Sequence, residues 1–407
     1  MANSSVEPLI EAPSRQELPL SLRLRFYLMA SITLSFLAGS SIPTPIYPIY
    51  QAEWHFSSVT ITFIFAVYAL SVLASLLVCG RVSDYVGRRP VLLIATVMQI
   101  VAMYLMGAAD GLADLIGGRV LQGLSTGAAV AAVGAGLIDI DKPRGEIANA
   151  IAPVSCSAVG ALVGSVIVQF LPFPTHTVFA LLGGLFALQL GCVLAMKETT
   201  PTRPGALRSL IPKFGVPAQV RPAMLVASAV FFAGWALAGF CASLGPGLIK
   251  SVFDLSASLV GGLALATFSG SGVAAILALK SQPAATQTYA GCFGLLAGMS
   301  LMLGSLQVNS ITCFFSGVLV AGAGFGAGFQ GGIRMVVARA LPHQLAGVLS
   351  VAFVCCYLGM GVPVIVAGYE NASGVEIIKT AQVFGALIIG LILLAVLGLI
   401  FAHRADR

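Results

Sequence analysis

A short charged stretch separates two long apolar segments near the start of the chain. It contains Arg81, Asp84, Arg88 and Arg89 within nine residues. Arginines beside a membrane-spanning segment stay in water on the cytoplasmic side. Asp84 is the only acid among them, so we expect it to pair with an arginine or to lie at a helix N-terminus, where negative charge is favoured. These residue types predict a network of charged contacts at a membrane surface.

Glycine and proline residues in the same stretch mark the expected ends of helices and the turn between them. Gly80 ends one apolar segment, Gly87 allows a sharp turn, and Pro90 suits the first turn of the next helix. The pattern G-x-x-x-D-x-x-G-R-R-P resembles the loop between helices 2 and 3 of the major facilitator superfamily, written G-x-x-x-D-x-x-G-R-(K/R). A plain cytoplasmic turn, the alternative, would need the arginines but not the glycine and aspartate at these spacings.

The resemblance adds a further acid to this loop. In the family, an acid at the end of helix 4 often joins the loop in a network that closes the cytoplasmic side. Asp139 is the candidate here, paired with Arg81 or Arg88, and the alternative is a solvated charged turn. The predicted gating network comprises Gly80, Arg81, Asp84, Gly87, Arg88, Arg89 and Asp139.

A second group of polar residues lies inside an apolar segment. Arg119, Gln122 and Thr126 share one helical face at spacings of three and four. Gly123 and Gly127 provide small residues for close helix contact. The stretch resembles the family's second motif, R-x-x-Q-G-x-x-x-G. An arginine within a membrane marks a functional site by default, and the alternative is that it extends to the outer surface.

Arg119 has few possible partners. All fifteen acids and all four histidines fall in predicted loops or at the ends of predicted spans. Arg119 must therefore bond carbonyls freed at the end of helix 1, an anionic or polar substrate, or water. Proton-coupled members of the family often carry a carboxylate in helix 1, and its absence here weakens the usual coupling scheme.

The elements that must position these residues follow from composition. The chain has 407 residues, of which 58% are hydrophobic and 9% charged, whereas soluble proteins are about one quarter charged. About twenty apolar helical residues span a bilayer. We expect an all-α membrane protein with twelve spans: 25–48, 58–79, 90–108, 115–138, 146–171, 176–196, 222–248, 257–279, 288–306, 311–338, 345–368 and 379–402.

Basic residues set the orientation. With both termini in the cytoplasm, 18 of the 21 Lys and Arg residues lie on that side, and only Arg119, Lys250 and Lys379 do not. The net charge of +6 therefore reports topology and contact with anionic lipid, not nucleic-acid binding. We expect a multi-pass protein of the bacterial inner membrane.

The chain divides into two related halves. The expected parts are a cytoplasmic tail (1–24), a six-helix bundle (25–196), a basic linker (197–221), a second six-helix bundle (222–402) and a short tail (403–407). An offset of 199 residues places Gly118, Gly123, Gly127 and Pro143 on Gly317, Gly322, Gly326 and Pro342. This match predicts a parallel repeat. The second copy lacks the charged loop, and Val318 stands where Arg119 stands in the first.

The transport path is predicted from broken helix ends and from the resemblance. Pro43, Pro45 and Pro48 interrupt helix 1 and free carbonyls, which a membrane tolerates only beside protein or a water-filled cavity. Tyr47 beside them either lines this path or is an interfacial aromatic residue. In the family, helices 1, 4, 7 and 10 line the cavity. This implies Phe232, Trp235, Phe329 and Gln330 as substrate contacts, with ordinary packing as the alternative.

Helix 5 bears on the direction of transport. Gly160 and Gly164 match part of the antiporter pattern G-x-x-x-G-P-x-x-G-G, but Ser165 replaces the proline. We expect a secondary transporter working by alternating access, with proton-coupled efflux of a drug-like or amphipathic molecule as the first hypothesis. The alternatives are an uptake symporter or facilitator of a polar or anionic metabolite and, distantly, a membrane-embedded enzyme. We expect a monomer without metal or cofactor, whose partners are a small-molecule substrate and the lipid bilayer.

Overall fold

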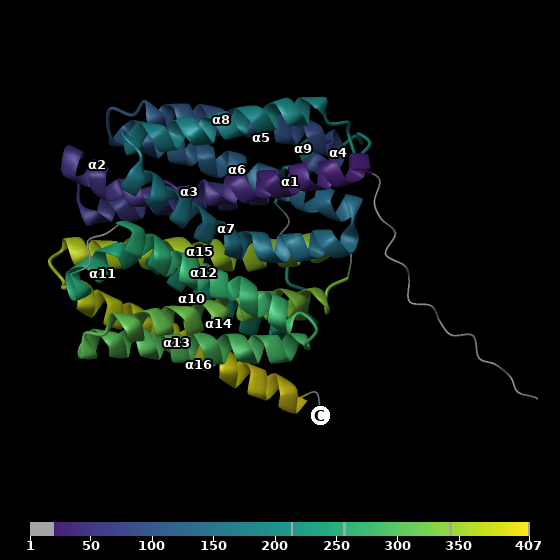
Figure 1. Cartoon of the computed structure of the whole chain (residues 1–407). Helices are drawn as coiled ribbons and strands as arrows, with labels where there is room; N and C mark the ends of the chain where they lie inside the picture. The colour runs from purple at the N-terminus through teal and green to yellow at the C-terminus, as the bar shows by residue number, and fades with distance from the viewer. Residues whose placement is uncertain (1–19, 213–214, 255–257, 342–343, 406–407) are drawn as a thin grey trace, which may run out of the picture.

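The computed structural model describes residues 20–212, 215–254, 258–341 and 344–405. Every regular element in these ranges is a helix. Figure 1 shows the helices of the first half above those of the second, with their axes running roughly side by side. The prediction of an all-α membrane protein is confirmed by this architecture and by the long apolar helices within it.

The first half contains six long helices and several short ones. The long helices are α1 (Leu20–Ala38), α3 (Ser58–Cys79), α5 (Arg88–Gly107), α6 (Leu112–Ile140), α7 (Lys142–Phe170) and α8 (Pro174–Ala195). The short ones are η1 (Thr44–Ile46), α2 (Tyr47–Trp54) and α4 (Ser83–Val86). A further short helix, α9 (Ala206–Ser209), lies in the linker to the second half.

The second half repeats this plan. Its helices are α10 (Arg221–Ser243), α11 (Gly245–Phe253), α12 (Ser258–Leu279), α13 (Ala284–Val308), α14 (Ile311–Val337), α15 (Leu345–Ala372) and α16 (Ile377–Ala405). Among the described residues, eleven helices are long and apolar enough to cross a membrane, and α1 is not one of them. The count of twelve spans and the cytoplasmic placement of the termini remain predictions.

The end of the first helix is broken where the prolines stand. α1 stops at Ala38, and turns lead through Pro43 into η1 and α2. A proline has no backbone N–H, so it cannot continue the helical hydrogen bonds. The carbonyls of Gly39 and Ser40 are consequently available to other groups.

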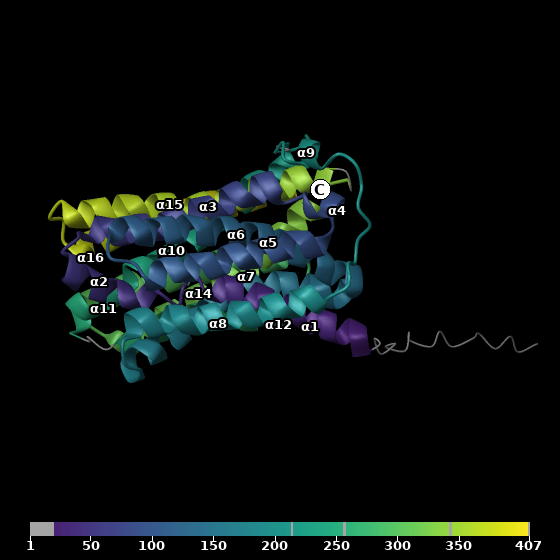
Figure 2. The same cartoon turned by 90° about the horizontal axis from the view of Figure 1, so that it is seen from above.

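Two pairs of helices make most of the contact between the halves. α3 packs against α15, and α7 packs against α12. Figure 1 and Figure 2 both place α3 beside α15. Buried side chains of α3 and α7 belong to the same hydrophobic cluster as the core of the second half. The described contacts across this interface are therefore mainly apolar.

The glycines related by the offset of 199 residues pack in equivalent ways. A Cβ added to Gly123 or Gly127 would collide with α3, at Tyr68 and Ser75 among other residues. A Cβ added to Gly322 or Gly326 would collide with α12. In each half these glycines bring the fourth long helix close to the second.

Candidate functional site

The charged loop is organised around one guanidinium. Arg88, the first residue of α5, is 6% exposed. Its Nη1 donates to Ser83 Oγ at 2.6 Å and to Asp84 Oδ1 at 2.5 Å. Its Nε and Nη2 both donate to Asp139 Oδ2 at 3.3 Å. Arg88 therefore ties α4, α5 and α6 together at one end of the first half.

Of the two arginines predicted as partners of Asp139, the structure selects Arg88. Arg81 instead donates to the Tyr85 hydroxyl at 3.3 Å. The carboxylates of Asp84 and Asp139 are 51% and 42% exposed, while the guanidinium between them is buried. Asp139 is thus held in an ion pair, not free in a solvated turn.

A carboxylate that the sequence did not reveal completes this network. Glu198 follows the end of α8, and its Oε1 and Oε2 accept from the backbone N–H groups of Arg88 and Arg89 at 2.9 and 3.0 Å. The N–H groups of Thr199 and Thr200 also donate to Oε1, at 2.8 and 3.1 Å. Glu198 caps the N-terminus of α5, where a negative charge is stabilised. One signal could have found it: it is the only acid in the basic linker.

The hydrogen bonds change the acidity of Glu198. Partial burial disfavours its charged form, but the N–H donors of Thr200, Thr199, Arg88 and Arg89 outweigh burial together and lower the pKa of the carboxyl. A lowered pKa keeps Glu198 ionised at neutral pH, so the cap is permanent under ordinary conditions.

Glu198 also explains why glycine occupies position 87. Gly87 has φ of +97°, a region that side-chain-bearing residues rarely adopt. A Cβ built there would strike the Glu198 carboxylate. Arg89 also joins α5 to the end of α8, because its side chain donates to the carbonyls of Val193 and Leu194 at 3.2 and 2.5 Å.

Arg119 lies deep inside the first half. It is fully buried, so it does not extend to the outer surface. Its Nη1 donates to Gln122 Oε1 at 2.7 Å, and its Nη2 donates to the Ser40 carbonyl at 3.1 Å. Gln122 Nε2 donates to the Gly39 carbonyl at 3.0 Å. Of the three partners considered for Arg119, the structure shows carbonyls freed at the end of α1.

Two tyrosines cover the guanidinium. Arg119 Cζ lies 5.5 Å from the ring centre of Tyr47 and 5.0 Å from that of Tyr68, within the range of cation–π attraction. In the described part of the chain, no carboxylate forms an ion pair with this arginine. Thr126, on the same helical face, donates to the Gln122 carbonyl of its own helix at 2.8 Å and does not bond Arg119.

Two further glycines let α7 approach the broken helix end. A Cβ at Gly160 would strike the Ala38 carbonyl, and one at Gly164 would strike the Ile42 carbonyl. Any larger residue at either position would push α7 away from the turn that holds Arg119.

A small cavity of about 30 Å³ lies between the two halves. It is lined by Ser40, Ser41, Phe65, Pro153, Val154, Trp235, Ala238, Ala242, Leu265, Ser269, Phe325 and Met360. Drug-sized ligands fill pockets of roughly 300–1,000 Å³. The cavity is therefore too small to hold a drug-sized molecule in this structure.

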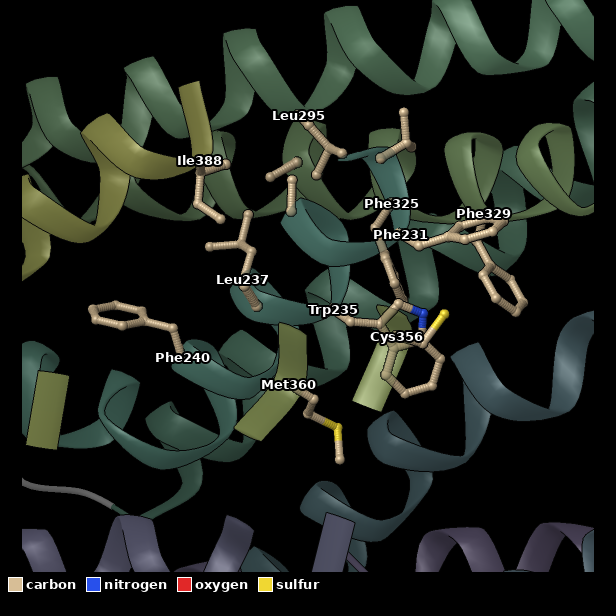
Figure 3. Close-up of a cluster of buried hydrophobic side chains, with 14 of the residues drawn as sticks. Phe231, Trp235, Leu237, Phe240, Leu295, Phe325, Phe329, Cys356, Met360 and Ile388 are labelled. Carbon is tan, nitrogen blue, oxygen red and sulfur yellow. The ribbon is translucent and has the colours of Figure 1, made fainter. Parts of the chain in front are cut away.

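Only one of the four aromatic or amide residues predicted as substrate contacts lines this cavity. Trp235 does, while Phe329 packs behind it with ring centres 5.9 Å apart. Figure 3 shows Phe325 and Met360 close to the indole. Phe232 and Gln330 do not line the cavity. Phe325, which the sequence reading missed, lies one helical turn before Phe329 and shares its face.

The described residues contain no group of three or more His, Cys, Asp or Glu side chains that could hold a metal ion. The cavity has an apolar aromatic wall on the second half, and the Ser40–Arg119 cluster borders it on the first.

Comparison with known proteins identifies the family. A family model described as Major Facilitator Superfamily matches residues 29–363. Multidrug resistance protein MdtL of Escherichia coli O6:K15:H31 (strain 536 / UPEC) is 28% identical over 182 residues, covering 43% of this chain and 46% of MdtL. MdtL of Escherichia coli O45:K1 (strain S88 / ExPEC) is 27% identical over 179 residues, covering 43% and 45%. The matched stretch thus spans less than half the length of these curated relatives.

A solved structure extends the similarity of fold to nearly the whole chain. The human organic anion transporter MFSD10 (TETRAN) superposes with a TM-score of 0.66 at 18% sequence identity. The superposition covers 94% of this chain and all of the other. At this level of identity the likeness shows a shared fold.

Proposed function

Because this chain belongs to the Major Facilitator Superfamily, we propose that it exports a drug-like or amphipathic small molecule by alternating access, driven by the proton gradient. It acts as a monomer in the bacterial inner membrane. The observation that carries this proposal is the cavity between the halves, which both halves line and which is too small for a substrate in the closed state. The partial similarity to multidrug resistance proteins supports efflux.

The transport cycle follows from two sets of contacts: those between the halves and those within the first half. Separation of α3 from α15, or of α7 from α12, on one side opens the cavity to that side. The Arg88 network and the Glu198 cap join elements within the first half, so that half moves as one body. A substrate shifts the balance between states only by binding one of them more tightly.

Proton coupling is assigned to the exposed carboxylates that share Arg88. In the described long helices, Asp114, Asp139, Glu146 and Glu370 all lie within two turns of a helix end. A proton on Asp139 would remove one charge from the Arg88 network and weaken its hold on α6, and a proton on Asp84 would weaken its hold on α4. This links proton binding to the gate without a carboxylate at the membrane centre.

Everted membrane vesicles test the proposal. A pH-sensitive acridine dye reports the proton gradient while neutral, anionic and cationic aromatic drugs are added in turn. We expect at least one compound to release protons, and Trp235→Ala to reduce the response about tenfold. Trp54→Ala is the matched control, since Trp54 stacks on Tyr50 and does not line the cavity. Vesicles that hold a gradient and contain the protein, yet respond to no compound, would contradict coupled efflux.

The same vesicles separate efflux from the second candidate, uptake of a polar or anionic metabolite. That candidate is favoured by the buried Arg119, which has no carboxylate partner among the described residues. Accumulation of a labelled anion by intact cells, with no proton release in everted vesicles, would establish uptake instead.

A further inference from the structure

We propose that the substrate of the cavity between the halves is an aromatic organic anion, whose ring packs on Trp235 and whose carboxylate or sulfonate is attracted to Arg119. The inference rests on the proposed transport function and specifies the charge of its substrate.

The first observation is an uncompensated charge next to the cavity. Ser40 lines the cavity, and its carbonyl accepts from Arg119 Nη2 at 3.1 Å. One residue therefore separates the guanidinium from the space that the substrate enters. Its other partners, an amide and two tyrosine rings, carry no net charge. A buried ion without a counter-ion is unfavourable. Electrostatic attraction therefore favours the binding of an anion near Arg119 and disfavours the binding of a cation.

The second observation concerns the unused hydrogen-bonding atoms. Within the described residues, Arg119 Nε and Trp235 Nε1 are buried and have no hydrogen-bond partner. Arginine and tryptophan side chains are donors only. Only hydrogen-bond acceptors can therefore pair with these two atoms. A carboxylate or sulfonate supplies such acceptors, and an ammonium group does not.

The third observation is the character of the remaining wall. Phe65, Phe325, Leu265 and Met360 line the cavity together with the indole of Trp235. The indole also packs edge-on against Phe325, with ring centres 5.8 Å apart. An apolar wall with an oriented donor suits an aromatic body that bears one polar group, because the body gains by leaving water while the polar group keeps its hydrogen bonds.

Tryptophan fluorescence gives a direct test, because the chain contains only two tryptophans. Trp54→Phe leaves Trp235 as the sole reporter in purified full-length protein in lipid nanodiscs. The probes are 4-nitrobenzoate, 4-nitrobenzamide and 4-nitrobenzylammonium, which share a quenching ring and differ in charge. We expect nitrobenzoate to bind at least about tenfold more tightly than the ammonium compound, with the amide between them.

Variants assign the preference to Arg119. Arg119→Gln should lower nitrobenzoate affinity about tenfold and change nitrobenzamide affinity by less than about twofold, whereas Arg119→Lys should keep the anion preference. Arg144→Gln is the matched control: this arginine is exposed and pairs with Asp141 at the start of α7, and its loss should leave all three affinities unchanged.

Three results would overturn the inference: equal binding of the three probes, an anion preference that survives Arg119→Gln, or no quenching by any probe. If the variants do not fold, the order of affinities in the Trp54→Phe protein still decides. Failure of this inference is distinguishable from failure of the proposed function. Equal probe binding with proton release in vesicles removes only the charge preference, while anion preference without proton release removes only coupled efflux.

Discussion

The two halves hold equivalent loops by opposite means. In the first half, Arg88 stands at the loop and bonds the carboxylate of Asp139 on α6. In the second, Arg334 stands on α14 and donates to the backbone carbonyls of Lys280 and Gln282 at 3.3 and 2.8 Å. The first contact joins two charged groups, whereas the second joins a charged group to neutral carbonyls. The first half therefore holds its loop by an ion pair, and the second by hydrogen bonds to the backbone.

The helices α6 and α14, which occupy equivalent places in the two halves, also differ in charge. α6 carries the buried Arg119 cluster, while the equivalent position in α14 is Val318, which is buried among apolar residues. Phe325 and Phe329 continue that helix toward Trp235. The buried charged cluster thus lies in one half and the aromatic cluster in the other. The predictions below test how far this division holds.

The largest effect is expected from Gly87→Ala. Its positive φ and the approach of Glu198 both oppose a side chain. We expect the free energy of unfolding to fall by about 3 kcal/mol, measured by denaturation of the purified protein in detergent.

A second glycine distinguishes the cost of the positive φ from the cost of a steric clash with Glu198. Gly374 has φ of +90° but open space where a Cβ would lie, so Gly374→Ala should cost only about 1 kcal/mol. Adding Glu198→Ala to Gly87→Ala should restore part of the stability. Equal losses at both glycines would show that the Glu198 contact does not matter.

Arg88→Gln should have the next largest effect. It leaves Asp84 and Asp139 facing each other without the cation between them. We expect a loss of about 2 kcal/mol in the free energy of unfolding and a drop of about tenfold in the vesicle transport rate. Unchanged transport with reduced stability would limit Arg88 to a structural role.

Glu198→Gln should remove about 1 kcal/mol, the usual value of a helix N-cap, and the loss should depend on pH. The pKa of Glu198 is lowered in the folded protein, so its stabilising effect is complete above the ordinary carboxyl value of 4.5 and is lost as the pH falls through the lower, folded-state pKa. Thermal unfolding of both proteins should differ at pH 7 and converge well below pH 4.5. A difference that persists unchanged in acid would argue against the cap.

Arg334→Gln should have the smallest effect, within about 0.5 kcal/mol, because the residue is exposed and bonds only neutral carbonyls. Transport should stay within about twofold of the wild-type rate, measured in the same vesicles. A loss as large as that of Arg88→Gln would show that both halves are gated alike.

The sequence by itself determined the elements and their local chemistry. Apolar runs of sufficient length predict the helices because each must satisfy its own backbone in lipid. The prolines after Ser41 predict the broken end of α1, and the spacing of the small residues predicts close contacts at Gly123 and Gly127. The charges of Arg88 and Asp139 indicated an ion pair but left Arg81 as an equal choice.

Only the tertiary structure decided which distant groups meet. Glu198 reaches the N-terminus of α5 across more than a hundred residues, and Arg119 finds the Ser40 carbonyl on another helix. Likewise, Phe325 lines the cavity while Gln330 does not. Helical periodicity tells which residues share a face, but the rotation of each helix against its neighbours is set by packing of the whole bundle. That rotation selects the residues that line the cavity.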